Sequence, residues 1–420
     1  MKKYFFIGIL ILLGNATLQS QSVKLEDLLA KAVQFAPINS QINYYKQSGR
    51  LVESTLQSGY YPKLTLDAQA SYQSDVFAIP INLPNLSMQQ IPKEQYKSSV
   101  NINQMIYDGG VISNLISKSE IDSKVNVKNV ESNLTKIRDN VIKLYFSILE
   151  IQDNITIIEN YNQKLSSDRN KFKIMLENGT ATKGIISKFD LESIKLKQKI
   201  SMLELDLQVI KKNLSELCNF DVNSLQFEIP TEPVVDYNVI KRPEIESLEL
   251  KKSSLDAGKS LAKSTLLPKI YLFAQVGIGS PNPFNMFEIK NSAFYMTGIR
   301  LNWEIYDWSV ASKNSEMLEI NSKIIDSEKD NFTQNLRIAI NNYEGELEKF
   351  TNMVGDDLEM IEIQNRIVSE RKLQLENGTV GATDYFIELN TLLDLELNME
   401  LHKTKLLNAK INLQNISGNY

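Results

Sequence analysis

Residues 176–180 have the sequence LENGT, and residues 375–379 repeat it letter for letter 199 positions later. The same offset separates Tyr107-Asp108 from Tyr306-Asp307. Landmarks that recur in the same order indicate one structural unit present twice in tandem. The sequence therefore predicts two repeats, at 21–218 and 243–420, joined by an equatorial connector at 219–242.

Each repeat is predicted to contain a helix, a β-hairpin, a very long helix and a shorter return helix. The first repeat begins with a helix broken near Pro37, because proline interrupts the helical hydrogen-bond pattern. Pro243 opens the helix of the second repeat, at a position where proline fits. The predicted hairpins are 63–107 and 269–306, the long helices 110–177 and 309–376, and the return helices 182–218 and 382–417.

The strands of both hairpins alternate apolar and polar residues. From Lys63 to Ser74, apolar residues take every second position beginning at Leu64, and the pattern returns from Ile270 and from Ile299. A period of two indicates strands with one apolar and one polar face. The polar faces carry Asp67, Gln69, Arg300, Asn302 and Glu304.

The long helices follow a heptad pattern. Apolar residues spaced alternately by three and four run from Leu134 to Leu176, where only Asn162 and Arg169 are polar. The same register recurs 199 residues later, from Leu336 to Leu375. A sustained period of 3.5 indicates coiled-coil packing. Helix lengths suggest that the return helix 182–218 stacks end to end with the helix from Pro243, and the C-terminal return helix with the N-terminal helix.

The first 20 residues are typical of a secretory signal peptide. Lys2 and Lys3 precede a short apolar run from Tyr4 to Leu13 that is too short to span a bilayer. Their removal would change the formal net charge from −5 to −7, which argues against a nucleic-acid partner. The single cysteine, Cys218, excludes an intrachain disulfide and fits a buried helix face; no cysteine follows the signal, so no lipid anchor is expected.

Four alternating strands of about ten residues have the length that a tilted strand needs to cross a bilayer. Four strands are too few to close a barrel, and open edges cannot face lipid, so the chain must oligomerise. Aromatic residues cluster at the strand ends nearest the helices, where an interfacial belt belongs. They are Tyr60, Tyr61, Tyr107, Trp303, Tyr306 and Trp308. A soluble β-sandwich is the alternative, but strands continuing into such long helices do not fit it.

The sequence resembles the TolC-type outer-membrane factor proteins, also called outer membrane efflux proteins. The resemblance covers the whole mature chain. It rests on the order and spacing of Pro62-Lys63-Leu64 and its counterpart at Pro268, Tyr107-Asp108-Gly109-Gly110, Tyr306-Asp307-Trp308, Arg242-Pro243-Glu244, Gly179 and Gly378. It implies a mainly α-helical homotrimer: a twelve-stranded membrane β-barrel, four strands per chain, continued by a coiled-coil tunnel through the periplasm.

The resemblance also implies a function and a location. The chain would be a passive exit channel in the outer membrane of a Gram-negative bacterium, serving a tripartite efflux pump or a type I secretion system. Its partners would be a periplasmic adaptor (membrane fusion) protein, an inner-membrane pump and outer-membrane lipid. The alternative is a periplasmic coiled-coil adaptor, which has no need of four bilayer-length strands.

Two sites follow from the resemblance. The helix turns at Gly179, Thr180, Gly378 and Thr379 would dock the adaptor, although the glycines also serve simply as helix stops. Asp384 would form a channel constriction that attracts cations, with a solvated surface aspartate as the alternative. A second aspartate of the family pattern is Ile387 here, next to Glu388, and the first repeat has Ile185 in place of Asp384.

No catalytic or cofactor site is predicted. His402 is the only histidine and is expected on a helix surface, without a second histidine or cysteine nearby for a metal or a triad. The sequence contains no phosphate-binding loop. We therefore expect a protein that is not an enzyme and that takes no metal or cofactor, with its cargo determined by its partners.

Overall fold

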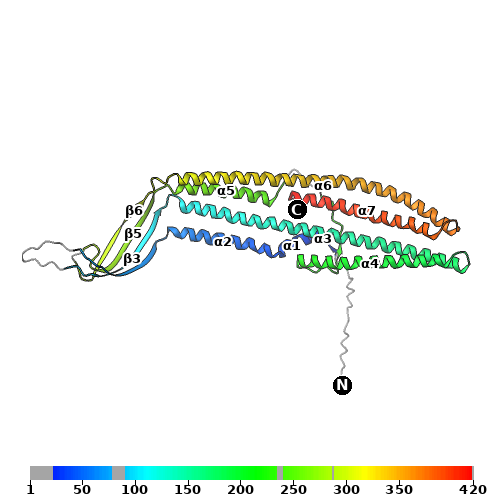
Figure 1. Cartoon of the computed structure of the whole chain (residues 1–420), viewed down its shortest axis with the longest axis horizontal. Coiled ribbons are helices and arrows are strands. Elements are labelled where there is room, and N and C mark those ends of the chain that lie inside the picture. Colours follow the sequence, from blue (N-terminus) through cyan, green and yellow to red (C-terminus); the bar gives the residue numbers. More distant parts are fainter. Residues whose placement is uncertain (1–21, 78–89, 234–239, 286–287, 419–420) are drawn as a thin grey trace, which may run out of the picture. The chain divides into compact units, whose positions relative to one another are not determined.

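The computed structural model describes residues 22–77, 90–233, 240–285 and 288–418. The predicted signal peptide lies outside them. The chain divides into two compact units. Unit 1 contains Met1–Asn39, Ser132–Arg242 and Gln334–Tyr420; unit 2 contains Ser40–Glu131 and Pro243–Thr333. Two helices of 67 residues, α3 (Val111–Glu177) and α6 (Val310–Glu376), contribute to both units (Figure 1).

Unit 2 contains an antiparallel sheet with the strand order β2-β3-β5-β6. Its strands are β2 (Lys63–Tyr72), β3 (Glu94–Tyr107), β5 (Lys269–Ser280) and β6 (Ser292–Asn302). The second hairpin stops at Asn302, short of its predicted end at 306. Asn302 is paired with Lys269, the first residue of β5, and the preceding Pro268 has no N–H with which to extend the ladder.

The two aspartates of the recurring Tyr-Asp pair cap the long helices, which begin three residues later at Val111 and Val310. The Asp108 carboxylate accepts backbone hydrogen bonds from Gly110 and Ile112, at 2.9 and 2.5 Å. Asp307 accepts them from Ser309 and Ala311, at 2.9 and 2.7 Å. Each aspartate thus satisfies free N–H groups of a helix N-terminus and places its charge favourably there. The motif recurs because both helices need a cap.

The residues after each cap adopt a left-handed conformation. In the first copy these are Gly109 and Gly110, with φ of 71° and 85°. The equivalent residues of the second copy, Trp308 and Ser309, have φ of 56° and 62°. Left-handed conformations are unfavourable for residues with a Cβ atom, so the second turn carries local strain that the first avoids.

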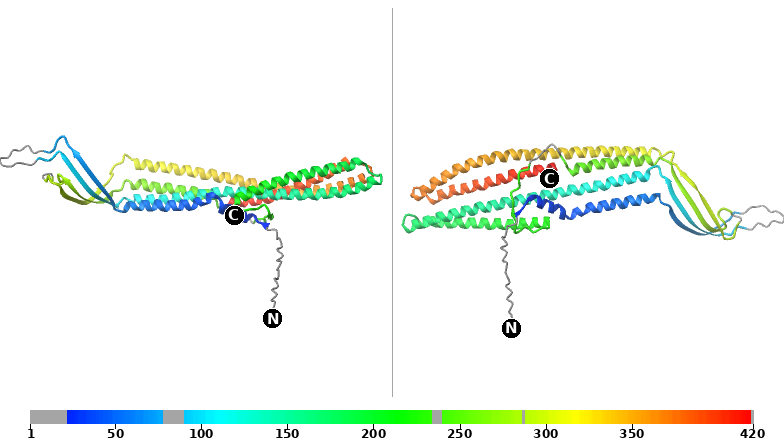
Figure 2. Two further views of the ribbon diagram at one scale, coloured as in Figure 1. Left: turned by 90° about the horizontal axis from the view of Figure 1, so that it is seen from below. Right: turned by 180° about the vertical axis from the view of Figure 1, so that it is seen from behind.

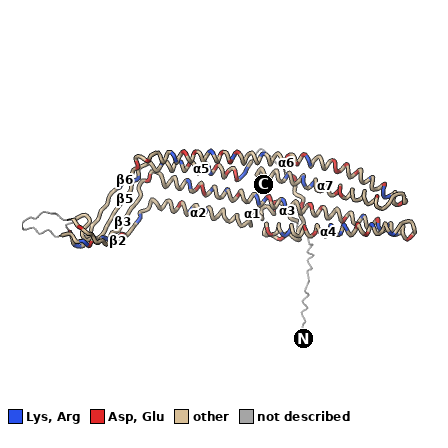
Figure 3. Tube along the Cα trace, viewed as in Figure 1, with Lys and Arg blue, Asp and Glu red and all other residues tan. Residues whose placement is uncertain are grey.

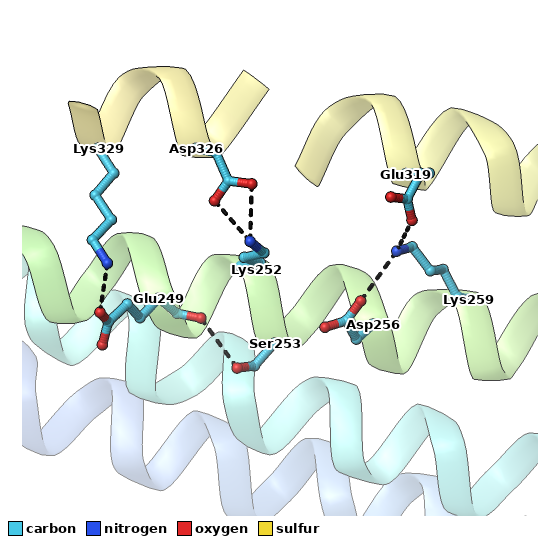
Figure 4. Close-up of polar contacts among 8 residues, drawn as sticks. All are labelled: Glu249, Lys252, Ser253, Asp256, Lys259, Glu319, Asp326 and Lys329. Atoms are coloured by element: carbon cyan, nitrogen blue, oxygen red, sulfur yellow. Dashed lines mark hydrogen bonds and ion pairs between the residues drawn. The ribbon is translucent and has the colours of Figure 1, made fainter. Parts of the chain in front are cut away.

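The remaining helices of unit 2 are α2 (Ser40–Gln57) and α5 (Pro243–Ser264). Ion pairs join α5 to α6: Lys252 to Asp326 at 2.7 Å, Lys329 to Glu249 at 2.8 Å, and Lys259 to Glu319 at 2.5 Å (Figure 4). The residues that α5 buries are mostly small, including Ser247, Ser254 and Gly258. Exposed ion pairs contribute little each and are screened by salt, so this ladder mainly fixes the register of the two helices.

Unit 1 contains α1 (Leu25–Phe35), α4 (Lys183–Cys218), α7 (Ala382–Ser417) and a short 3-10 turn (Pro37–Asn39). It also contains α3 from Ser132 onward and α6 from Gln334 onward. Within it, α4 lies along α3 and α7 along α6 in each view (Figures 1 and 2). Charges of both signs are interspersed along these helices (Figure 3). One apolar core joins α1, α3, α4 and α7, and a second joins α3, α4, α6 and α7 towards the turns.

The predicted stacking of the short helices is wrong. The end of α4 packs on α1, where Leu214 and Cys218 join Leu28 in one buried core. The backbone N–H of Lys241, just before α5, donates to the carbonyl oxygen of Ser417 at the end of α7. A short parallel pair, β1 (Ser22–Val23) with β4 (Gln226–Phe227), holds the connector in place. The end of α4 therefore packs on α1, and the end of α7 is bonded to the connector residue Lys241.

Among the described residues, no helix is both long enough and apolar enough to cross a lipid bilayer.

Candidate functional site

The two LENGT segments form the same turn. After α3, the N–H of Thr180 donates to the carbonyl of Met175 at 2.8 Å, and that of Gly179 to Leu176 at 3.0 Å. After α6, Thr379 donates to Gln374 at 2.9 Å and Gly378 to Leu375 at 3.1 Å. Both patterns are Schellman caps, which need a left-handed residue after the helix. Gly179 and Gly378 supply it, with φ of 74° and 69°.

Replacing Gly179 or Gly378 by alanine is expected to destabilise unit 1 by about 1–2 kcal/mol each, through the left-handed conformation alone. A Cβ atom at either position would meet nothing within 4 Å. Gly345→Ala in α6 is the control, since that glycine is helical and equally unobstructed. This control should gain about 0.5–1 kcal/mol. Thermal unfolding followed by circular dichroism measures the loss of stability expected at the two turns and the gain expected for Gly345→Ala. Equal changes of melting temperature in all three variants would contradict the need for a left-handed glycine at the turns.

Asp384 lies in the first turn of α7 and is exposed. Its carboxylate accepts a hydrogen bond from the backbone N–H of Gly381 at 3.1 Å, so it caps the helix. Ile387 is 56% exposed on the same helix. Glu388 is engaged instead with the amide of Gln364 on α6, at 2.8 Å. Asp384 is therefore exposed to solvent while it caps α7, whereas Glu388 is partly buried and bound to a side chain of α6.

A buried polar cluster near the turns was not predicted. Asp168 on α3 is 2% exposed, forms an ion pair with Lys372 on α6 and accepts a hydrogen bond from the Tyr385 hydroxyl on α7 at 2.6 Å. Burial raises the pKa of Tyr385, and the hydrogen bond to Asp168 adds to that effect. The sequence did contain an indication of this burial: Asp168 lies three residues after Leu165 and four before Phe172, which are both buried on the same face of α3.

The sheet presents one apolar and one polar face, as the alternation predicts. On the apolar face Leu66 lies opposite Val100, which lies opposite Val276. These side chains are exposed by 72%, 39% and 61%. Across the same strands, the polar face carries Asp67, Ser99 and Gly277. A contiguous exposed apolar face on a sheet marks a surface that meets lipid or another protein.

The aromatic side chains at the helix-proximal strand ends are exposed by 45% to 76%. They are Tyr61, Tyr107, Trp303, Tyr306 and Trp308. Three of them are fixed by neighbours: the Trp303 indole N–H donates to the Leu266 carbonyl at 3.0 Å, and Tyr306 packs edge-on against Trp308, with ring centres 5.0 Å apart. Amphipathic rings that keep their polar atoms hydrogen-bonded are typical of a membrane interface.

His402 does not lie on a helix surface. Its Nδ1 atom is 2.6 Å from the Asp357 carboxylate on α6, and its side chain is 14% exposed. Cys218 is fully buried, and burial raises the pKa of its thiol to about 11. In the part of the chain that the structure describes, no group of three or more acidic, histidine or cysteine side chains is placed to hold a metal ion.

Comparisons with known proteins identify the fold. The structure of the outer membrane protein VceC from Vibrio cholerae is similar with a TM-score of 0.72 and 11% identity, over 94% of this chain and 96% of that one. The Campylobacter jejuni CmeC outer membrane channel gives 0.68 and 14%, over 94% and 85%. The open Neisseria gonorrhoeae MtrE outer membrane channel gives 0.66 and 14%, over 94% and 89%. No curated protein matches the sequence.

Structural similarity at such low sequence identity shows the fold alone. Evidence on the family comes from a match of the sequence to a family model. Residues 54–182, from α2 through the first helix turn, match the outer membrane efflux protein family model. The predicted resemblance is therefore confirmed: over residues 54–182 the chain matches the outer membrane efflux protein family, and it has the fold of the outer membrane channels of known structure.

Proposed function

We propose that the chain is one subunit of a homotrimeric exit channel in a Gram-negative outer membrane. The observation that carries the proposal is the four-stranded sheet, which has one apolar exposed face and unpaired edges at β2 and β6. Unsatisfied edge groups cannot face lipid. Three such sheets joined edge to edge give a twelve-stranded closed barrel, a size compatible with an open lumen.

In this proposal the apolar sheet face contacts outer-membrane lipid, and Tyr61, Tyr107, Trp303, Tyr306 and Trp308 form the interfacial belt. The helices of the three chains build a periplasmic tunnel, and the polar sheet face lines the barrel. The channel is passive; a periplasmic adaptor and an inner-membrane pump, of an efflux or type I secretion system, supply cargo and energy. The turns at Gly179, Thr180, Gly378 and Thr379 dock the adaptor.

The mass and shape of the detergent-extracted particle test this proposal. An elongated trimer extracted from the outer-membrane fraction supports it. A compact monomer in the soluble periplasmic fraction would contradict it and favour a periplasmic adaptor. The four strands already argue against an adaptor, because such a protein has no use for a bilayer-length apolar sheet face.

We further propose that three copies of Asp384 form a cation-attracting constriction near the helix turns. Asp384→Asn removes the charge while an asparagine can still cap the helix. In a planar bilayer the cation-to-anion permeability ratio should fall about twofold or more. Asp394→Asn, which removes another exposed negative charge elsewhere on α7, is the control. Unchanged selectivity in Asp384→Asn would assign Asp384 to helix capping alone.

A further inference from the structure

The polar face of the sheet is strongly basic, in contrast to the chain as a whole. Strand register places four cations, Lys63, Lys97, Lys269 and Arg300, on the same face as the single acid Asp67. Lys63 lies opposite Asn103, and Lys97 opposite Gly279. Lys269 and Arg300 face Asn302 and Tyr271. The face therefore carries a net charge of +3, whereas the chain carries −5.

Two of these cations are held over aromatic rings. The Arg300 guanidinium lies 5.1 Å from the ring centre of Phe273, and the Lys97 ammonium 5.5 Å from that of Phe294. Cation–π attraction at these distances holds both positive charges close to the polar face of the sheet. Lys97 and Phe294 belong to β3 and β6, and they meet across the intervening β5.

Glycines make this arrangement possible. Lys97 and Phe294 lie opposite Gly279 and Gly277, which leave the surface of β5 open. A Cβ atom at Gly277 would approach the Phe294 ring to 2.6 Å. A Cβ atom at Gly298 would approach the Phe273 ring to 3.0 Å. The rings therefore lie directly on the strands, a known way to cover glycine in a sheet.

The acid on this face is already engaged. The side-chain amide of Asn101 donates a hydrogen bond to the Asp67 carboxylate. Gln275 likewise donates to the Ser99 hydroxyl at 3.1 Å, so the neutral polar groups satisfy one another. The unbalanced charge of the face is thus cationic.

We propose that this face, which we call the basic band (Lys63, Lys97, Lys269 and Arg300), makes the barrel favour anions and anionic cargo. The inference rests on the proposed trimeric channel, in which three copies of the band encircle the lumen. Rings of lysine and arginine select anions, as rings of carboxylates select cations. The channel would then have opposite preferences at two sites: a cation-attracting Asp384 ring at the turns and an anion-attracting wall in the barrel.

The test is block of the full-length channel in a planar bilayer by hexacyanoferrate(II), a compact tetravalent anion, added on the barrel side. Addition on that side reports on the barrel even when the helix turns limit the current. The electrolyte is about 10 mM KCl, where the Debye length is about 30 Å. The variant is Lys97→Gln/Arg300→Gln. Lys290→Gln is the control, because it removes an exposed lysine from the β5–β6 loop and leaves the band intact.

The variant should require at least about fivefold more hexacyanoferrate(II) for half block than the wild type, and the control should not differ. The difference should shrink in 1 M KCl, where charges are screened within about 3 Å. If the double variant does not assemble, Lys97→Gln and Arg300→Gln alone carry the test. A conducting channel whose anion block is identical in every variant overturns the basic band. A wild-type protein without conductance contradicts the channel itself.

Discussion

Replacing Lys372 by methionine is expected to lower the free energy of unfolding of unit 1 by about 3–5 kcal/mol. The change leaves the Asp168 carboxylate buried, at 3% side-chain exposure, with its counter-ion gone. Only the Tyr385 hydroxyl would remain to compensate it. A buried charge stripped of its counter-ion keeps its desolvation penalty and loses the attraction that offset it. Because the cluster joins α3, α6 and α7, the loss should loosen all three helices near the turns.

Matched variants separate this effect from a general loss of a lysine. Lys173→Met removes an exposed lysine of α3 and should change stability by less than about 0.5 kcal/mol. Tyr385→Phe removes only the neutral hydrogen-bond donor and should cost about 1–3 kcal/mol. Asp168→Leu combined with Lys372→Met should recover most of the loss, since replacing both charges removes the penalty. Denaturant unfolding followed by circular dichroism measures these changes in the free energy of unfolding. If the changes caused by Asp168→Leu and Lys372→Met simply add in the double variant, the two charges are not coupled as a buried pair.

Periodicity predicted which residues of each long helix are buried. The predicted heptad positions on α6, from Leu336 to Leu375, include no exposed residue, and Leu336, Phe350, Val368 and Leu375 are buried. On α3 the buried face is wider than the heptad, because Ile142, Tyr145 and Phe146 are also buried. A heptad describes one packing seam, whereas α3 packs against both α4 and α7.

The partners across those faces could not be read from the sequence. A periodic pattern indicates that a face is covered but says nothing about which helix covers it, so the contacts of Asp168 and His402 with other helices went unseen. The stacking of the short helices was wrong for the same reason. The Tyr145 hydroxyl, 3.0 Å from the Val23 carbonyl and 2.6 Å from that of Glu228, shows how long-range polar contacts fix the connector.

Local chemistry was more informative at the candidate site. The left-handed conformation of the glycine in each LENGT segment was predicted correctly, because it depends only on the local turn that ends the helix. The charge balance of the polar sheet face was not predicted, although all five charged residues lie in predicted hairpins. The balance depends on strand register, which places Lys63 and Lys97 from different strands on one face.

Raising the pH above about 10.5 is expected to unfold unit 1 steeply, because three of its tyrosines must stay protonated in the folded state. Tyr145, Tyr161 and Tyr385 are 0%, 5% and 0% exposed. Burial is the main cause that raises the pKa of each above its ordinary value of 10.0, since it disfavours the phenolate. Hydrogen bonds hold the protons in place: Tyr161 donates to Asn390 at 2.9 Å, and Tyr385 to Asp168.

The sign of the effect follows from proton binding. Above the ordinary tyrosine pKa the unfolded chain loses these protons while the folded chain keeps them, so stability falls as pH rises. Each group contributes about 1.4 kcal/mol per pH unit, and three together about 4 kcal/mol per unit, until the raised pKa values are reached. Lys211 acts in the opposite direction, because burial lowers its pKa, but its contribution ends near its ordinary value of 10.5.

Circular dichroism and the ultraviolet absorbance of tyrosinate, recorded together from pH 9 upward, test this expectation. Loss of helix should coincide with a cooperative rise in tyrosinate, since the buried phenols ionise only on unfolding. Tyr385→Phe should remove about a third of the pH slope while lowering stability at neutral pH by about 1–3 kcal/mol. Tyr44→Phe, which alters a side chain 64% exposed in unit 2, should leave the slope unchanged. A gradual tyrosinate titration of all tyrosines with the helices intact would show that these three hydroxyls reach solvent, and would remove the physical basis of the predicted alkaline transition.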